Sequence, residues 1–553
     1  MDLIDRSRTA EANQPPPLVD YDLFAADAAL TEGAKREGAT WAIPSFHEIG
    51  RKAGSAEAIA WGFDANRFAP ILRTHDRYGL RIDEVEFHPS YHHLMNVAVS
   101  YGMHAAPWRD PRPGAHVARA AKFYMWSQVD AGHGCPISMT YAAVPALRTE
   151  PEVAGEWEPL LAAPVYDPGL RPLSEKRGVL CGMGMTERQG GSDVRSNTTR
   201  AQSVGRGGAR EMYLLTGSKW FCSAPMCDAF LVLAQADEGL SCFLVPRVLP
   251  NGARNVFRIQ RLKDKLGNRS NASSEVEFDG TSATMIGEPG RGVQTIIAMV
   301  NQTRLDCVIG SAAGMRQAVV QAIHHASHRR AFGKLLIDQP LMRNVLADLA
   351  LESEAATTLM LRLACACDRS ARDAQESHVQ RVGTAVAKYW VCKRAAVHAG
   401  EALECLGGNG YVEEFIMPRL YREAPLNSIW EGSGNVNALD VLRVLVKSQA
   451  AAEAFFAEIE QAAGADRRLD AAAAALRQTI AANGETEAEW SARSIVERMA
   501  LVLQASLLVR HAPSAVADGF CATRLDNEGG RAFGTLPTGA DAEAILERAL
   551  ASR

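Results

Sequence analysis

The stretch Met185-Thr186-Glu187-Arg188-Gln189-Gly190-Gly191-Ser192-Asp193-Val194 stands where the pattern of the chain changes. It combines hydroxyl groups with backbone amides that the glycines leave accessible. Such a stretch can bring N–H and O–H donors up to a phosphate or to the edge of a heteroaromatic ring. An isolated Gly-Gly-Ser-Asp sequence is also typical of an ordinary turn, so the neighbouring sequence has to decide between a binding loop and a turn.

Short runs of β-branched and aromatic residues follow this stretch, spaced by roughly ten residues with turn residues between them. They are Met212 to Leu215, Phe230 to Gln235, Ser241 to Val245 and Glu275 to Phe278. This spacing predicts a small antiparallel β-barrel between Met183 and Gly287.

Helical patterns flank the predicted barrel on both sides. After Ile296 the apolar residues recur every three or four positions, and one stripe of a long helix runs from Leu305 to Ala326. Two further long helices are expected near residues 341–366 and 376–403, and an Ala-rich helical segment after Asp440. The order of helices, strands and helices predicts an α+β fold. Its four parts are an N-terminal α-helical domain (1–182), the barrel (183–287), a helical bundle (288–440) and a C-terminal helical extension (441–553).

Composition excludes several classes of protein. The chain has 553 residues, 47% of them hydrophobic, and a net charge of −5, so no global positive field draws it to nucleic acid or to an anionic membrane. No run of about 18 apolar residues occurs and the first residues are polar and acidic, which predicts a cytoplasmic protein without a membrane partner. The spacing of the 11 cysteines indicates buried thiols rather than disulfides or a zinc site, and no metal site is expected.

Three further stretches carry candidate ligand-binding groups. Lys219-Trp220-Phe221-Cys222-Ser223 ends a predicted strand with two aromatic rings and a small hydroxyl, which suits a flat ring at a barrel mouth. Arg329-Arg330-Ala331-Phe332-Gly333-Lys334 follows the long helix, where guanidinium groups suit a diphosphate. Gly407-Gly408-Asn409-Gly410-Tyr411 turns tightly after a helix. Each pattern taken alone is also typical of a core segment, a solvated basic turn or a simple helix end.

One carboxylate stands apart in Asn427-Ser428-Ile429-Trp430-Glu431-Gly432-Ser433-Gly434-Asn435. Glu431 has two apolar neighbours before it and two glycines close after it. Such a setting can desolvate a carboxyl group and raise its pKa toward the working pH of a general base. The alternative is a glutamate that caps a helix.

In order and spacing, these five stretches resemble the acyl-CoA dehydrogenase family over about residues 100–445. The resemblance extends to Arg261–Gly267, Ser273–Phe278 and Gly287–Gly292. It implies a helical domain, a β-barrel and a four-helix domain that bind FAD in a homotetramer. The implied FAD contacts are Met185, Thr186, Gly191, Ser192, Phe221, Ser223, Arg329, Phe332, Gln339, Glu404, Gly408, Ser433 and Asn435.

This chain departs from the family pattern at three of those positions. Phe221 replaces the usual tryptophan, and Ser433 replaces a threonine but keeps the hydroxyl group. Glu404 replaces a glutamine, and a carboxylate there would repel a diphosphate.

The resemblance also implies a reaction. The family oxidises an acyl-CoA thioester to the enoyl form, with a carboxylate that removes the α-proton, and Glu431 matches the position of that base. Some relatives carry the base on the earlier long helix, but Asn301-Gln302-Thr303-Arg304 offers no carboxylate at that place.

Within the family, the whole chain is most similar to a bacterial branch that takes part in the response to alkylating agents. That similarity implies binding of double-stranded DNA, together with weak activity on short or branched acyl-CoA. The alternative is a metabolic acyl-CoA dehydrogenase with no DNA role. Residues 440–553 hold 12 Lys and Arg against 16 Asp and Glu, a net charge of −4, which matches a DNA footprint poorly. The candidate DNA contacts of this tail are Arg467, Arg468, Arg477, Arg493, Arg498 and Arg510.

A second basic segment is an alternative place for phosphate contact. Residues 247–269 contain seven Lys and Arg against one acid, Asp264. The segment lies at the predicted barrel edge.

Overall fold

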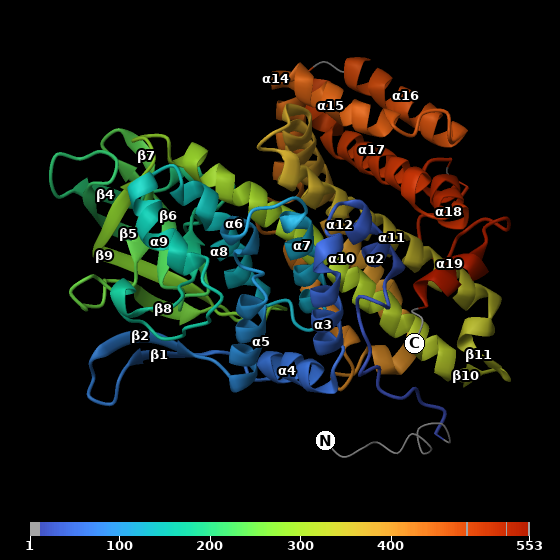
Figure 1. The fold of residues 1–553 in the computed structure, drawn as a ribbon, viewed down its shortest axis with the longest axis horizontal. Helices are drawn as coiled ribbons and strands as arrows, with labels where there is room; N and C mark the ends of the chain where they lie inside the picture. The colour runs from blue at the N-terminus through green and yellow to red at the C-terminus, as the bar shows by residue number, and fades with distance from the viewer. Residues whose placement is uncertain (1–11, 483–484, 527, 551–553) are drawn as a thin grey trace. The chain divides into compact units, whose positions relative to one another are not determined.

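The computed structural model describes residues 12–482, 485–526 and 528–550 (Figure 1). The chain forms two compact units, each assembled from separate segments of the sequence. We call them the helical unit (Met1–Ile59, Pro113–Gln128 and Cys307–Arg553) and the barrel unit (Ala60–Arg112 and Val129–Asp306). The N-terminal helices are thus shared between the two units. The four domain boundaries expected from the sequence stay predictions.

A closed sheet forms the centre of the barrel unit. Strand β6 pairs with β4 on one side and β7 on the other, and the ring continues through β5 and β9. Strand β3 also pairs with β6, and β8 lies beside β9. The strands are β3 (Cys181–Gly184), β4 (Arg200–Ser203), β5 (Met212–Ser223), β6 (Ala229–Ala236), β7 (Gly239–Pro246), β8 (Arg258–Leu262) and β9 (Ser273–Ile286).

The predicted barrel is confirmed, but two of its pairings are parallel. Both β3 and β4 run parallel to β6, whereas the other pairings are antiparallel. Parallel neighbours need a long connection. Apolar periodicity indicates which residues are buried but not the direction of neighbouring strands. The parallel pairings therefore could not be predicted from the sequence.

The interior of the barrel is aromatic. The rings of Phe230 and Phe257 stack with centroids 4.9 Å apart, and Phe243 is fully buried with them in the barrel core. Strand β3 passes close to this core, since a Cβ at Gly182 would lie 2.4 Å from the Phe230 ring. Glycine is therefore required there.

Helices and a hairpin complete the barrel unit. The hairpin of β1 and β2 was not expected from the sequence. These elements are α4 (Ala56–Arg67), β1 (Ile71–His75), β2 (Arg81–Glu86), α5 (Pro89–Ser100), α6 (Ala106–Arg109), α8 (Gly134–Leu147) and α9 (Pro151–Leu161).

Long helices dominate the helical unit. Every apolar residue of the predicted Leu305–Ala326 stripe is buried, which confirms the first long helix. The two helices expected near 341–366 and 376–403 are confirmed as α11 and α12. The helices are α2 (Ala28–Arg36), α3 (Ile43–Ala53), α7 (Ala115–Ser127), α10 (Gly292–His328), α11 (Pro340–Arg369), α12 (Ala374–Cys405), α13 (Met417–Glu423), α14 (Gly434–Lys447), α15 (Gln449–Glu460), α16 (Arg467–Ala482), α17 (Glu485–His511), α18 (Ser514–Arg524) and α19 (Ala542–Ala549), with a small hairpin of β10 (Arg330–Ala331) and β11 (Lys334–Leu335).

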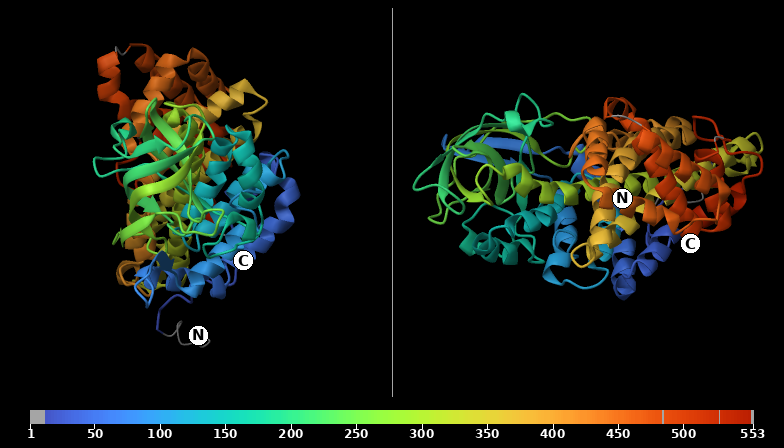
Figure 2. Two further views of the ribbon diagram at one scale, coloured as in Figure 1. Left: turned by 90° about the vertical axis from the view of Figure 1, so that its left-hand side faces the viewer. Right: turned by 90° about the horizontal axis from the view of Figure 1, so that it is seen from above.

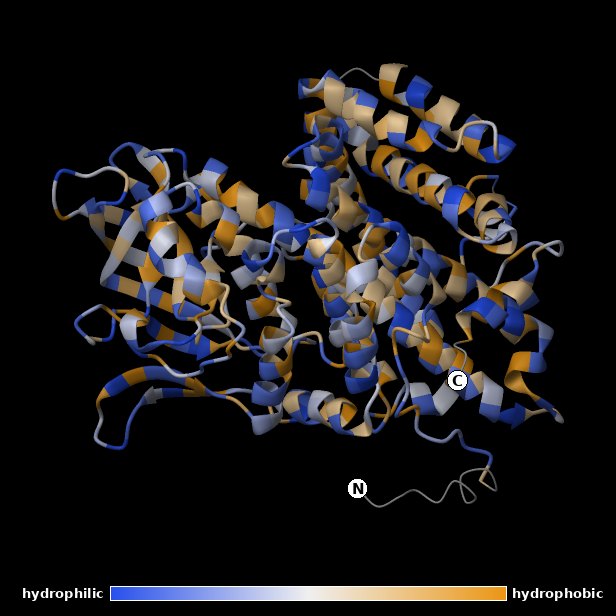
Figure 3. Ribbon diagram, in the orientation of Figure 1, coloured by the Kyte–Doolittle hydropathy of each residue, from blue (hydrophilic) through white to orange (hydrophobic). Residues whose placement is uncertain are grey.

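The C-terminal extension packs on α11 and α12 within the helical unit. Its helices stay together in both views of Figure 2, and polar and apolar residues alternate around α16 and α17 in Figure 3. That alternation is typical of helices that bury one face. None of the helices in the described ranges has the length and hydropathy that a membrane-spanning segment needs. All 11 cysteines are free and buried, as expected.

Buried ion pairs fasten this extension. Arg362 of α11 binds the Glu458 carboxylate of α15 at 3.0 and 2.8 Å, and Arg510 of α17 binds the same carboxylate at 2.7 Å. Arg524 of α18 bridges Asp348 and Glu352 of α11. The extension is therefore an integral part of the helical unit.

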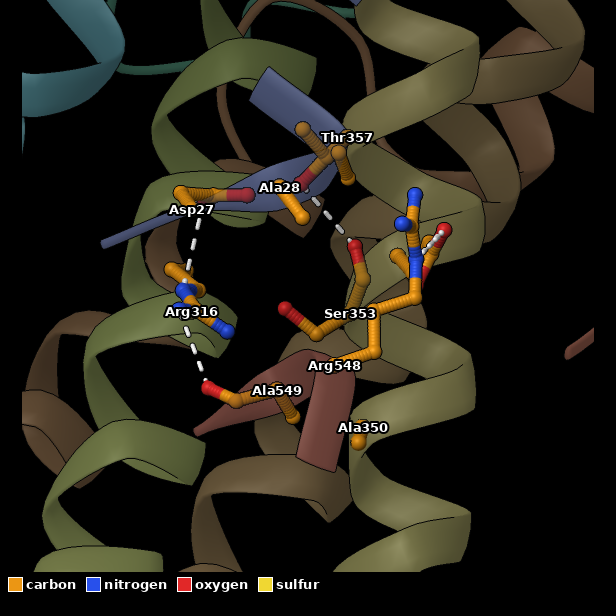
Figure 4. A pocket seen from close by; sticks show the side chains of 10 residues that line it. Asp27, Ala28, Arg316, Ala350, Ser353, Thr357, Arg548 and Ala549 are labelled. Carbon is orange, nitrogen blue, oxygen red and sulfur yellow. Dashed lines mark hydrogen bonds and ion pairs between the residues drawn. The ribbon is translucent and has the colours of Figure 1, made fainter. Parts of the chain in front are cut away.

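Helix α19 is held in a similar way. Arg316 lies between Asp27 and the Ala549 carbonyl oxygen, which accepts a hydrogen bond of 3.3 Å (Figure 4). Arg548 pairs with Glu354 at 2.9 Å. The cavity that these residues line measures about 10 Å³, which is far too small for a cofactor.

Candidate active site

Two predicted stretches of the barrel unit meet at one end of the barrel. Met185 and Thr186 directly follow β3, and Ser223 is the last residue of β5. The Trp220 N–H donates a hydrogen bond to the Thr186 carbonyl oxygen at 2.8 Å, which joins the loop after β3 to the end of β5. The Phe221 ring next to it is 49% exposed. Hydroxyl groups, backbone amides and an aromatic face thus lie in one place.

The glycines of the loop after β3 let neighbouring groups pack close to its backbone. A Cβ at Gly191 would come within 2.4 Å of the Thr186 hydroxyl oxygen, so a larger residue here would have to displace the Thr186 side chain. Ser192 follows and is exposed. The Ser223 and Ser273 hydroxyl oxygens lie 3.2 Å apart.

A buried ion pair anchors the same loop to the barrel. Lys219 Nζ donates to Glu187 Oε1 at 2.8 Å and to the Leu233 carbonyl oxygen at 2.7 Å. The Glu187 carboxylate also accepts hydrogen bonds from the backbone and hydroxyl groups of Thr198 and Thr199. Burial raises the pKa of Glu187, but the bonds from Lys219 and Thr199 outweigh it and lower the pKa to about 2. Glu187 is therefore charged at neutral pH and fixes the residues on either side of it.

Replacing Lys219 by methionine tests this anchor. We expect the variant to lose about 3 kcal/mol of stability, because it leaves the buried Glu187 carboxylate without its cation. Thermal unfolding followed by circular dichroism measures the loss. Lys35→Met, at an exposed position of α2, is the control and should unfold like the wild type. Equal midpoints for both variants would contradict the anchoring role.

Glu431 occupies an unusual backbone conformation in the helical unit. Its φ is +58° and that of Gly432 is +99°. A glutamate in the left-handed region costs about 1–3 kcal/mol and persists only where its surroundings impose it. Lys388 Nζ donates to the Gly432 carbonyl oxygen at 3.0 Å, and Asn437 Nδ2 donates to it at 2.6 Å. These two bonds hold the turn that presents Glu431.

The residues before Glu431 are held separately. Trp430 Nε1 donates to Asn427 Oδ1 at 2.8 Å, and Asn427 Nδ2 donates to Ser311 Oγ of α10 at 3.1 Å. Ile429 is 64% exposed and Glu431 is half-buried, so the desolvation of the Glu431 carboxylate stays a prediction.

Three of the residues expected at FAD, Arg329, Phe332 and Gln339, lie around the β10–β11 hairpin. Phe332 lies at its tip with a φ of +54° and is 98% exposed. Gln339 Nε2 donates to the Ala331 carbonyl oxygen at 3.2 Å, and Arg329 Nη1 donates to the Asn13 carbonyl oxygen at 2.9 Å. An exposed aromatic residue in a strained turn is an unusual feature that calls for a functional reason.

Glu404 lies in the last turn of α12 and Gly408 in the short 3-10 turn that follows it, and both are exposed. A Cβ at Gly408 would meet open space. Burial, with the charges of Glu404 and Asp348, raises the pKa of the neighbouring Glu401. The acidic surroundings make this helix end a poor place for a diphosphate.

Three of the six arginines predicted to bind DNA are neutralised by carboxylates. Arg468 pairs with Asp466 and Asp518, and Arg477 pairs with Glu460. Arg510 pairs with Glu458. The other three make different contacts or are simply exposed. Arg493 donates to Asn435, Arg498 donates to Thr479, and Arg467 is exposed.

The second basic segment, at the barrel edge, is neutralised in the same way. Arg261 and Lys263 share the Glu275 carboxylate, and Arg254 pairs with Glu84. Arg247 is buried and donates to the Asp83 carbonyl oxygen at 2.9 Å. Most cations of this basic segment thus have partners within the protein.

A larger cavity of about 680 Å³ lies in the barrel unit. It is lined by α6, the end of α8, α9 and the residues that follow, including Trp108, Arg148 and Pro159. None of the predicted site residues lines it, so it is separate from the candidate site.

Several residues that shape the site were missed from the sequence. Lys388 and Lys219 are almost fully buried, and Lys393 lies against the start of α14. A lysine inside an otherwise apolar stretch, such as Val386-Ala387-Lys388-Tyr389-Trp390-Val391, is the signal that could have indicated them.

Comparison with known families gives three matches along the chain. Residues 13–168 match the adaptive response protein AidB N-terminal domain. Residues 182–281 match the acyl-CoA dehydrogenase middle domain, and residues 290–446 match the acyl-CoA dehydrogenase C-terminal domain. The middle-domain match covers the barrel strands up to β9, and the last match contains Glu431.

Individual relatives cover almost the whole chain. AidB of Escherichia coli (strain K12) is 47% identical over 520 residues, which are 94% of each chain. Acyl-CoA dehydrogenase family member 11 of Caenorhabditis elegans is 31% identical over 498 residues, 84% of this chain and 79% of that protein. The crystal structure of Caenorhabditis elegans ACDH-11 in complex with C11-CoA superposes with a TM-score of 0.84 at 26% identity and covers 92% of each chain. The chain therefore belongs to the acyl-CoA dehydrogenase family of FAD-dependent oxidoreductases.

Proposed function

We propose that the protein binds FAD and dehydrogenates an acyl-CoA thioester, with Glu431 as the base that removes the α-proton. The observation that carries this proposal is the conformation of Glu431. The Glu431 backbone lies in the left-handed region, and Lys388 and Asn437 hold the turn beside it through hydrogen bonds to the Gly432 carbonyl oxygen. Reacting groups need this kind of preorganised support.

The residues expected at the cofactor fit the chemistry of FAD. At the barrel end, the Thr186 and Ser223 hydroxyls and nearby amides supply donors and acceptors for the polar edge of the isoalloxazine, and Phe221 offers an exposed ring beside it. Arg329 and the amides at the start of α14 suit phosphate groups. FAD would supply the hydride acceptor for the β-hydrogen.

Glu431 would hold the proton taken from the α-carbon of the substrate. The Glu431 backbone N–H would donate to the thioester carbonyl oxygen, which makes the α-proton more acidic. Short or branched acyl chains are the substrate class we propose. The C11-CoA in the Caenorhabditis elegans structure makes longer chains the natural comparison.

Purified protein tests this directly. Its released flavin is identified by mass, and the loaded protein is titrated without oxygen with acyl-CoA thioesters of increasing chain length. We expect loss of the flavin absorbance band and an enoyl-CoA product that has lost two hydrogen atoms. Protein that takes up no FAD, or whose flavin keeps its colour with every thioester, contradicts the proposal.

Binding of duplex DNA is a second candidate function. The match of residues 13–168 to an adaptive response protein favours it, whereas the ion-paired arginines oppose a large electrostatic footprint. We propose that Arg467, Arg498 and about one further cation make the phosphate contacts to DNA. The protein would act in the cytoplasm as a homotetramer, and the exposed Phe332, Leu341 and Tyr411 are apolar groups that an assembly would cover.

Salt dependence tests the DNA candidate. About three phosphate contacts predict a log–log slope of about −2.7 and binding roughly 40-fold weaker at about 200 mM than at about 50 mM salt. Fluorescence anisotropy with a labelled duplex measures it. The double variant Arg467→Ala/Arg498→Ala should lower the slope to about −1, and the control Arg73→Ala, on the exposed β1–β2 hairpin, should leave it unchanged. No measurable binding at low salt rejects the DNA role.

A further inference from the structure

Cations from two helices converge on the start of α14. This helix of 14 residues begins at Gly434, and its first backbone N–H groups point out of its N-terminal end. Lys393 of α12 lies directly against that end, because a Cβ at Gly434 would be 2.9 Å from Lys393 Cε and 3.3 Å from Nζ. Lys388, one turn and a half earlier on α12, binds the Gly432 carbonyl oxygen.

Lys393 is half-buried, and within the described residues its ammonium group has no hydrogen bond and no carboxylate partner. Burial, together with the positive charges of Arg493 and Lys388, lowers the pKa of Lys393. A partly buried cation among other cations is costly unless an anion joins it. A negatively charged ligand would therefore stabilise this cluster of cations.

The third cation comes from the C-terminal extension. Arg493 of α17 donates through Nε to Asn435 Oδ1 at 2.8 Å. Among the residues that the structure describes, its two Nη nitrogens make no hydrogen bond, so the outer edge of the guanidinium group is available. Tyr389 and Glu497 border the cluster. The pKa of Tyr389 is raised, mainly because the side chain is buried. The positive charge of Arg493 opposes this shift and the negative charge of Glu497 adds to it.

We propose that Lys393, Arg493 and the N-terminus of α14 bind a phosphate of the adenosine diphosphate half of FAD, so that the C-terminal extension completes the cofactor site. This rests on the proposed FAD function. Guanidinium, ammonium and helix N–H groups that converge on one point suit a compact dianion. A DNA backbone would instead need cations spread along a face, and the arginines of this tail do not offer that.

The proposal reassigns one residue. Arg493 belongs to the set first expected to bind DNA, but the contact that the structure gives it is to Asn435, a residue expected at the cofactor. It also gives the extension a role in the chemistry of the site, because an arginine of α17 then acts on a ligand held by α12 and α14.

Release of FAD from the full-length, FAD-loaded protein tests the proposal. After dilution, the recovery of flavin fluorescence gives the dissociation constant. We expect Arg493→Ala to bind FAD about 10- to 100-fold more weakly, the effect of losing a charge-assisted hydrogen bond. Arg493→Lys should recover part of the affinity. The control Arg443→Ala removes an exposed arginine from α14 itself, whose one ion pair among the described residues is a long contact of 3.9 Å to Asp440. This variant should bind FAD like the wild type.

A second arm uses ADP and flavin-free protein, measured by calorimetry. If Arg493→Ala holds FAD as tightly as the wild type, the proposal is wrong and the FAD function stands. If the protein takes up no FAD but binds ADP in an Arg493-dependent way, the phosphate site stands and the FAD function fails. Equal ADP binding by both proteins, or a loss confined to duplex DNA binding, overturns the phosphate site.

Discussion

Replacing Glu431 by glutamine is expected to slow reduction of the bound flavin by an acyl-CoA on the order of 10³-fold, the usual contribution of a positioned general base. Glutamine keeps the size of the side chain and can occupy the same turn, but its amide cannot take a proton. The turn itself is held through the Gly432 carbonyl by Lys388 and Asn437, so FAD binding should be unchanged. Anaerobic stopped-flow measurement of the flavin absorbance gives the rate.

The matched control for this prediction is Glu453→Gln, which makes the same chemical change on the exposed surface of α15. It should reduce its flavin at the wild-type rate. If Glu431→Gln also did so, another group would be the base. If it instead lost FAD, Glu431 would be a structural residue of the cofactor site.

Replacing Glu458 by alanine is expected to remove about 3–5 kcal/mol of stability from the helical unit. The Glu458 carboxylate is buried and binds two arginines, Arg362 and Arg510. Its removal leaves both guanidinium groups in the interior without their shared anion. Urea unfolding followed by circular dichroism and hydrogen exchange of α15 and α17 measure the loss. The control Glu460→Ala changes a glutamate two residues after Glu458 on α15 and breaks its exposed pair with Arg477. It should lower the stability by about 1 kcal/mol or less.

The pH dependence of stability gives an independent check on Glu458. Burial raises its pKa, but Arg362 and Arg510 outweigh burial and lower the pKa to about 2, from an ordinary 4.5. A carboxyl group whose pKa is lowered by folding stabilises the protein above its ordinary pKa and loses that contribution as the pH falls toward the lowered value. The gap corresponds to about 3 kcal/mol, lost between about pH 4.5 and 2. Glu458→Ala should lack this part of the acid sensitivity, and an unchanged acid profile would contradict the role of the pair.

The strongly patterned elements of the fold could be predicted from the sequence. The stripe on α10 is set by residues such as Val308 and Ile309, which are buried on one helix face. The barrel strands β6 and β7 are apolar runs, and six of the eight residues of each strand are buried. Burial of apolar residues produces both patterns, so both were visible without a structure.

The β1–β2 hairpin could not be predicted, because tertiary contacts stabilise it. Strand β1 is exposed or half-exposed at every position. Strand β2 carries Asp83, whose carboxylate accepts the Ile259 N–H at 2.9 Å and pairs with Arg81. A strand held by polar contacts to a distant segment has no apolar period to detect.

The charge pattern misled for a related reason. Counting arginines in the tail identifies cations but not their partners. Arg510 reaches Glu458 and Arg468 reaches Asp518, each about 50 residues away in the sequence. Likewise, Glu431 could be nominated from its motif, but the lysines that support its turn and the start of α14 come from α12, some 40 residues earlier.

The role of Glu431 is tested most directly by mixing FAD-loaded protein, without oxygen, with butyryl-CoA that carries deuterium at the α-carbon. Proton removal by Glu431 predicts that the flavin bleaches, and that the labelled thioester bleaches it severalfold more slowly than the unlabelled one. Flavin that keeps its colour with both thioesters, or that bleaches equally fast in wild type and in Glu431→Gln, would contradict that role.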